Sequence, residues 1–126
     1  MGIQAIFQPD LSQLGMYAFD VCANKLIGDS AFANIHGLPV DKAANGLSIE
    51  FIINRIVDGD RERTAKEVHT AILTGAFIQS QFRVKTESGE LKHVGWFGRC
   101  LHDADGMPTQ FTGGVFDQSK GFVGRH

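Results

Sequence analysis

The clearest pattern in the chain is an alternation of apolar and polar residues in its last third. Ile78, Phe82 and Val84 alternate with polar neighbours, which predicts a β-strand with one buried face. Two turn sequences, Glu-Ser-Gly-Glu and Asp-Ala-Asp-Gly, separate this strand from two further apolar segments. The pattern therefore predicts an antiparallel meander with strands at residues 77–85, 91–102 and 109–116.

The first half of the chain contains shorter predicted elements. Strands are expected at residues 14–21 and 25–28, a short helix at 31–36 and a further helical turn at 41–44. Ser30 can cap the first of these helices, and Gly37 is suited to end it.

The middle of the chain contains one ambiguous segment and one clear helix. Residues 49–57 are rich in β-branched side chains, yet their spacing also suits a helix capped by Ser48, so periodicity leaves both open. Residues 60–73 are predicted to be helical, because Ala65, Val68 and Ile72 form one apolar stripe.

The long predicted strand at 91–102 is apolar on both faces. Val94, Trp96 and Cys100 share one face, while Phe97 and Leu101 lie on the other. A sheet with one solvated face alternates more cleanly, so we expect part of each face to be covered. The N-terminal leader or a second subunit could cover the outer one.

The length and the amino-acid composition are typical of a single globular domain. The 126 residues are 43% hydrophobic and 21% charged, with a net charge of −2. No basic stripe is visible, which argues against a nucleic-acid partner. No apolar run approaches the roughly 20 residues that span a bilayer, and no basic secretory start is present. We therefore expect a cytoplasmic protein without membrane contact, in which Cys22 and Cys100 are reduced, buried and inert.

Ordered motifs along residues 14–120 resemble PAS domains with the C-terminal PAC half, the sensory-box type found ahead of histidine kinases and diguanylate cyclases. The motifs that carry the resemblance are Tyr17-x-Phe19-Asp20, Phe32 with Gly37-Leu38-Pro39, Gly75-x-Phe77, Gln81-Phe82-Arg83-Val84, Ser88-Gly89-Glu90, Asp103-Ala104-Asp105-Gly106-x-Pro108, and Gly113 with Asp117-Gln118-Ser119. Each motif is weak alone, but their order and spacing are specific.

Two positions depart from the family pattern. Asp58-Gly59-Asp60-Arg61 lacks the His and Pro that usually open the long helix, and His93-Val94 stands where Trp-Val is usual. The resemblance implies an α+β PAS fold, a five-stranded antiparallel sheet with helices packed on one face. It also implies that 49–57 is helical, and it divides the chain into a leader (1–13), the PAS domain (14–120) and a tail (121–126).

The resemblance implies a sensory, signal-transducing module that binds a small ligand in an internal cavity or relays signals through protein contacts. The residues expected to line such a pocket are Tyr17, Phe19, Ile27, Phe32, Phe51, Ile56, Phe82, Val84 and Trp96. Asp117 and Ser119 match the pair that ends the sheet and launches the signalling helix in the family, so they are the expected output point. Partners implied are a second copy of the chain and an effector such as a histidine kinase or diguanylate cyclase in a longer chain.

The residues narrow the choice of cofactor. Haem needs an axial ligand, and segment 49–57 offers no His. Most of the five histidines are therefore expected on the surface or in turns. Covalent flavin chemistry needs a Cys in an Asn-Cys-Arg-Phe-Leu-Gln-like helix, which is missing. Non-covalent flavin or a small metabolite stays open, and no His, Cys or acidic pair has metal-site spacing.

Two rival functions remain. An interior filled by phenylalanines would suit a ligand-free dimerisation or interaction module. A small α+β cavity enzyme would need a buried acid–base pair, and a strongly shifted carboxylate or His inside a cavity would favour it. The sequence shows no nucleophile motif or phosphate loop, so no catalytic residue is expected.

Overall fold

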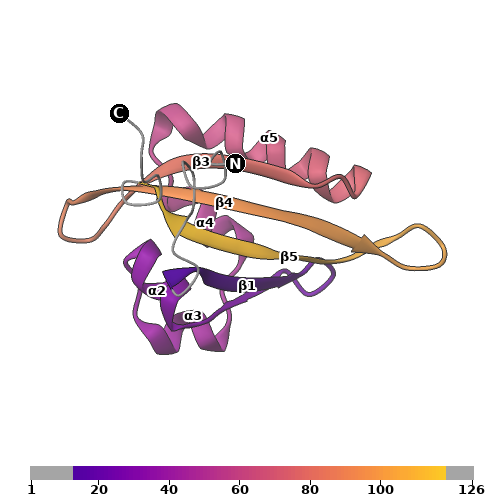
Figure 1. Cartoon of the computed structure of the whole chain (residues 1–126), viewed down its shortest axis with the longest axis horizontal. Coiled ribbons are helices and arrows are strands. Elements are labelled where there is room, and N and C mark those ends of the chain that lie inside the picture. Colours follow the sequence, from indigo (N-terminus) through magenta and orange to yellow (C-terminus); the bar gives the residue numbers. More distant parts are fainter. Residues whose placement is uncertain (1–12, 119–126) are drawn as a thin grey trace, which may run out of the picture.

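The computed structural model describes residues 13–118, which form one sheet and a set of helices (Figure 1). In chain order the elements are β1 (Gly15–Asp20), β2 (Lys25–Gly28), α2 (Ser30–His36), α3 (Val40–Asn45), α4 (Ile49–Arg55), α5 (Asp58–Thr74), β3 (Ile78–Lys85), β4 (Leu91–His102) and β5 (Pro108–Asp117). None of these helices is long and apolar enough to cross a bilayer.

The five strands form one antiparallel sheet in the order β2-β1-β5-β4-β3. The first and last strands of the chain thus meet at the centre, and the predicted meander makes up the other half. The α+β PAS fold expected from the sequence motifs is confirmed. The central pairing also brings β5, the strand nearest the C-terminus, into the middle of the molecule.

Two phenylalanines on the outer sheet face lie over glycines of the neighbouring strand. Phe97 pairs with Gly114, and Phe116 pairs with Gly95. A side chain added at either glycine would collide with the opposing ring, so the glycines make room for the aromatics. Phe97 also contacts the ring of Phe77 at a centroid distance of 6.3 Å. The second apolar face of β4 is therefore partly covered by its own chain.

Helix α4 resolves the ambiguous segment as helical, as the family pattern implied. Ser48 accepts a hydrogen bond from the Phe51 backbone N–H at 3.1 Å, which caps the first turn. In α2 the cap is Asp29 rather than the predicted Ser30. The Asp29 carboxylate accepts from the Phe32 N–H at 2.9 Å and also from Met16 of β1 at 3.1 Å, so it holds the helix against the sheet.

Helix α5 begins two residues earlier than predicted and turns a different face to the core. Thr64 and Ala71 are its buried residues, with Val68 half-buried between them, whereas Ala65 is exposed. The prediction that Ala65 belongs to the buried stripe was wrong. A threonine reads as polar in a sequence pattern, yet Thr64 occupies the position that faces inward.

An ion pair fixes the start of α5 to strand β3. The Asp60 carboxylate accepts from Arg83 Nε at 2.9 Å and from its terminal nitrogen at 3.0 Å, and it also accepts from the Arg83 backbone N–H at 2.9 Å. These hydrogen bonds hold the pKa of Asp60 below its usual range. The motif Asp58-Gly59-Asp60-Arg61 lacks the usual His and Pro of the family. Its Asp60 nevertheless sets the position of helix α5 over the sheet through the bonds to Arg83.

Candidate functional site

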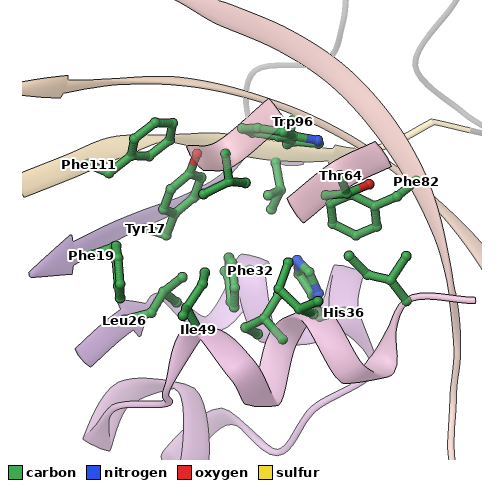
Figure 2. A pocket seen from close by; sticks show the side chains of 15 residues that line it. Tyr17, Phe19, Leu26, Phe32, His36, Ile49, Thr64, Phe82, Trp96 and Phe111 are labelled. Atoms are coloured by element: carbon green, nitrogen blue, oxygen red, sulfur yellow. The ribbon is translucent and has the colours of Figure 1, made fainter. Parts of the chain in front are cut away.

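A cavity of about 60 Å³ lies between the inner face of the sheet and the helices α2, α4 and α5 (Figure 2). All five strands and the helices α2, α4 and α5 contribute residues to its wall. The residues that line it are Tyr17, Phe19, Leu26, Phe32, His36, Ile49, Ile52, Ile53, Ile56, Thr64, Val68, Phe82, Trp96, Phe111 and Val115. The lining is almost wholly apolar, as is typical of small-molecule sites.

Six of the nine residues expected at the pocket line this cavity. They are Tyr17, Phe19, Phe32, Ile56, Phe82 and Trp96. The other three lie elsewhere. Ile27 is 45% exposed on the outer sheet face, because Leu26 takes the inward position in strand β2.

Phe51 and Val84 lie close to the cavity without reaching it. The inward positions belong to Ile49, Ile52 and Ile53 of α4 and to Ile56, the residue that follows the helix. Phe51 therefore faces away, under the charged ends of Lys42 and Arg55. Val84 is fully buried in the core, where its backbone bridges Ile56 near the end of β3.

Several lining residues were not expected from the sequence. Leu26, Phe111 and Val115 follow from strand alternation once the inward face of each strand is known. His36 and Thr64 could not be chosen in this way, because polar side chains give no apolar signal. The expectation that most histidines lie at the surface fits His69 and His93, which are exposed, but His36 is only 1% exposed.

The imidazole of His36 is neutral in the folded protein. Its ring stacks on Phe32 at a centroid distance of 4.3 Å and lies 5.8 Å from the ring of Phe82. Burial, together with the nearby charges of Arg55 and Lys92, lowers the pKa of His36 to about 3. Such an imidazole does not titrate near neutral pH, so it is not poised as a general base.

Three residues that line the cavity each carry a buried polar atom without a hydrogen-bond partner among the described residues. These atoms are Nδ1 of His36, the hydroxyl of Thr64 and the indole nitrogen of Trp96. The phenol of Tyr17 differs, because it donates to the Phe97 carbonyl at 2.9 Å. Burial raises the pKa of Tyr17 far above its usual value, so this hydroxyl stays protonated and occupied.

The free space of the cavity is small. A space of about 60 Å³ holds only a few heavy atoms. The only histidine of the cavity wall, His36, stacks flat on Phe32, and helix α4 has no cysteine for a covalent flavin bond.

The two cysteines occupy different environments. Cys100 is buried on the inner face of β4, and burial raises the pKa of its thiol. Cys22 is exposed in the turn after β1, so the prediction of a buried thiol was wrong there. Across residues 13–118 no three His, Cys, Asp or Glu side chains gather in a metal-binding arrangement.

Asp117, one of the two expected output residues, ends strand β5. It pairs with Val94 of β4, and the next residue continues the ladder through a bond from the Gln118 N–H to the His93 carbonyl at 2.8 Å. Val115, two positions earlier on the same face, lines the cavity. Ser119 and most of the predicted leader lie outside the described residues.

Comparison with known proteins agrees with this architecture. The N-terminal domain of a diguanylate cyclase with PAS/PAC sensor from Marinobacter aquaeolei superimposes with a TM-score of 0.73 at 14% identity, covering 82% of this chain and 94% of that one. A sensory box histidine kinase/response regulator from Burkholderia thailandensis has a TM-score of 0.73 at 16% identity, with 93% and 81% covered.

A third solved structure, the LOV protein of Rhodobacter sphaeroides, matches with a TM-score of 0.68 at 17% identity over 94% of this chain and 66% of that one. No curated protein matches the sequence. The family model of the PAS fold matches residues 26–115, most of the strands and helices described above. The chain therefore belongs to the PAS family of sensory domains.

Proposed function

We propose that this chain is the sensory module of a signalling protein and that its internal cavity binds a small ligand. The cavity itself is the observation that carries the proposal. Protein interiors are close-packed, and a void lined by large side chains lowers stability. A space of about 60 Å³ enclosed by Phe32, Phe82 and Trp96 is therefore best explained as a binding site.

The output passes through strand β5. Phe111 and Val115 touch the cavity, and Asp117 follows on the same face of the same strand. A ligand that shifts these side chains shifts the strand end as well. We propose that Asp117, with Ser119, couples cavity occupancy to an effector in a longer protein, such as a histidine kinase or a diguanylate cyclase. The cytoplasm is the fitting compartment, since it keeps the thiols of Cys22 and Cys100 reduced.

Filling the cavity tests ligand binding directly. Val68 lines the cavity from α5, so Val68→Phe places a ring in the free space. We expect native mass spectrometry of freshly purified protein to show a small non-covalent adduct that is lost in this variant. An absorption spectrum of the same sample identifies any coloured ligand.

The matched control is Val40→Phe at an exposed valine of α3, which should keep the adduct. An adduct that survives in Val68→Phe at the wild-type level would place the ligand outside the cavity. Bare protein in every sample, with no uptake of any compound from a small-molecule set, would contradict ligand binding.

A ligand-free interaction module is the second candidate, and the outer sheet face favours it. Met16, Ile27 and Leu101 are each close to half exposed there. A second copy of the chain, docking by the same face, would remove this apolar area from water at about 25 cal/mol per Å². We propose that the domain forms a homodimer through this face together with the leader.

The dimer is tested by light scattering coupled to size exclusion, from low to high micromolar concentration. We expect a mass near twice 13.8 kDa, and we expect Leu101→Glu to restore the monomer. Leu73→Glu, at an exposed leucine of α5, is the control and should leave the dimer intact. A constant monomer mass in the wild type would exclude the dimer, and an undiminished dimer after deletion of residues 1–13 would exclude the leader.

A further inference from the structure

The two sides of the cavity are both built from apolar side chains. Figure 2 shows the rings of Tyr17, Trp96 and Phe111 on the side of the sheet, and Phe32 and Ile49 on the side of the helices. The ring of Phe111 lies 6.3 Å from that of Tyr17 and 6.2 Å from that of Trp96 between centroids. Aromatic and aliphatic carbon atoms therefore surround a free space of about 60 Å³.

The polar atoms of the lining residues do not face this space. The hydroxyl of Tyr17 donates to the Phe97 carbonyl. The unpaired polar atoms of His36, Thr64 and Trp96 have almost no accessible surface. The surface that the cavity presents is almost wholly apolar, so these residues contribute carbon atoms to its wall. An occupant of the cavity finds no hydrogen-bond partner there.

Water does not suit a space of this kind. A buried water molecule typically makes about three hydrogen bonds, and cavities with apolar walls stay dry. A water molecule in this cavity would give up its bonds to bulk water and gain almost none from the wall. The cavity therefore excludes water and favours an occupant that forms no hydrogen bonds.

Charged and strongly polar molecules are disfavoured for the same reason. No Lys, Arg, Asp or Glu is among the residues that line the cavity. His36 supplies no positive charge near neutral pH, since burial keeps its imidazole neutral. An ion or a polar metabolite would lose its hydration on entry without a compensating bond, which is strongly unfavourable.

Resting on the proposed ligand-binding function, we propose that the cavity selects small uncharged apolar molecules of the short hydrocarbon class. Such a molecule leaves water with a gain of about 25 cal/mol per Å² of apolar surface. It also supplies the dispersion contacts that the side chains around an empty space lack. A volume of about 60 Å³ limits the ligand to about three to six heavy atoms.

Three cyclic compounds test polarity and size. Cyclopentane and cyclopentanone share one ring, whereas cyclooctane is apolar but larger. The chain has a single tryptophan, and Trp96 lines the cavity, so its indole N–H signal in a ¹H–¹⁵N spectrum reports on binding. We expect cyclopentane to bind about tenfold more tightly than cyclopentanone, because the ketone oxygen enters without a partner. Cyclopentanone still binds at the higher concentrations that its solubility allows, and cyclooctane should leave the signal unchanged.

A hydroxyl introduced into the wall should weaken this selectivity. Val115 lines the cavity from β5, and Val115→Thr keeps the side-chain shape while giving the ketone a donor. We expect the preference for cyclopentane to fall at least about threefold. Val68→Thr repeats the test from α5, with circular dichroism to check that both variants fold. Val40→Thr, at an exposed valine of α3, is the matched control and should keep the wild-type preference.

The outcomes separate this proposal from ligand binding as such. Cyclopentanone that binds as tightly as cyclopentane, or more tightly, would overturn the apolar selectivity and leave a binding cavity. An indole signal that none of the compounds moves would overturn both proposals. A preference for cyclopentane that both Val115→Thr and Val68→Thr leave intact would place the binding site outside this cavity.

Discussion

Phe32→Ala is expected to lower the free energy of unfolding by about 3–5 kcal/mol, the usual cost of removing a buried phenylalanine ring. Phe32 is 2% exposed and connects α2 to the sheet. Its ring lies 6.0 Å from Tyr17 and 4.3 Å from His36 between centroids, and it occupies the space that a side chain at Gly28 would need. Urea denaturation followed by far-UV circular dichroism measures the change.

The control is Phe77→Ala. Phe77 is 62% exposed, so the same truncation should cost no more than about 1 kcal/mol. Because Phe32 lines the cavity, its removal also enlarges a space that already exists, and benzene should raise the melting temperature of Phe32→Ala more than that of the wild type. A cost for Phe32→Ala no larger than that for Phe77→Ala would show that the packing around the cavity is not as described.

The stability of the protein should fall by about 2 kcal/mol between pH 7 and pH 5 because of His36. The folded state keeps this imidazole neutral, with a pKa lowered to about 3 mainly by burial, whereas the unfolded state binds a proton near pH 6.5. The stabilisation is therefore complete above pH 6.5 and is lost as the pH falls toward 3. Urea unfolding at several pH values measures it.

His36→Gln removes the titrating group and should flatten this part of the pH profile, although it lowers stability at pH 7. Asp60 and Glu50 also have lowered pKa values, so their contributions are lost only below about pH 4.5 and do not enter the window. An equal fall in the wild type and in His36→Gln would assign the pH dependence to other groups.

The strands of the meander were predictable because their signals are local. Strand β4 has the predicted bounds, Leu91–His102, since an Asp-Gly or Ser-Gly turn marks each end. Segment 49–57 was not predictable from periodicity, because isoleucines suit strands and helices equally. The structure shows that its isoleucines face one cavity while Phe51 faces cations on the other side, a distinction that exists only after the helix has packed.

The aromatic half of the candidate site was predictable, and the polar half was not. Phe82 stands on the apolar face of a cleanly alternating strand, so alternation was sufficient to place it, whereas the strand of Trp96 is apolar on both faces and alternation alone did not choose between them. The same reasoning misplaced Ile27 in the pocket, because β2 is too short to show which of its two faces is buried. His36 and Thr64 become recognisable only through their burial without partners, which depends on the side chains that surround them.

Occupancy of the cavity should be relayed to the end of strand β5. A ¹H–¹⁵N titration with cyclopentanone, a small uncharged compound chosen to suit a cavity of about 60 Å³, tests this relay in a single measurement. We expect the indole signal of Trp96 and the backbone amides of Val115 and Asp117 to shift together, with one binding constant. We expect Val68→Phe to abolish all three shifts. Shifts confined to the indole, with the amides of Val115 and Asp117 unchanged at saturation, would contradict it.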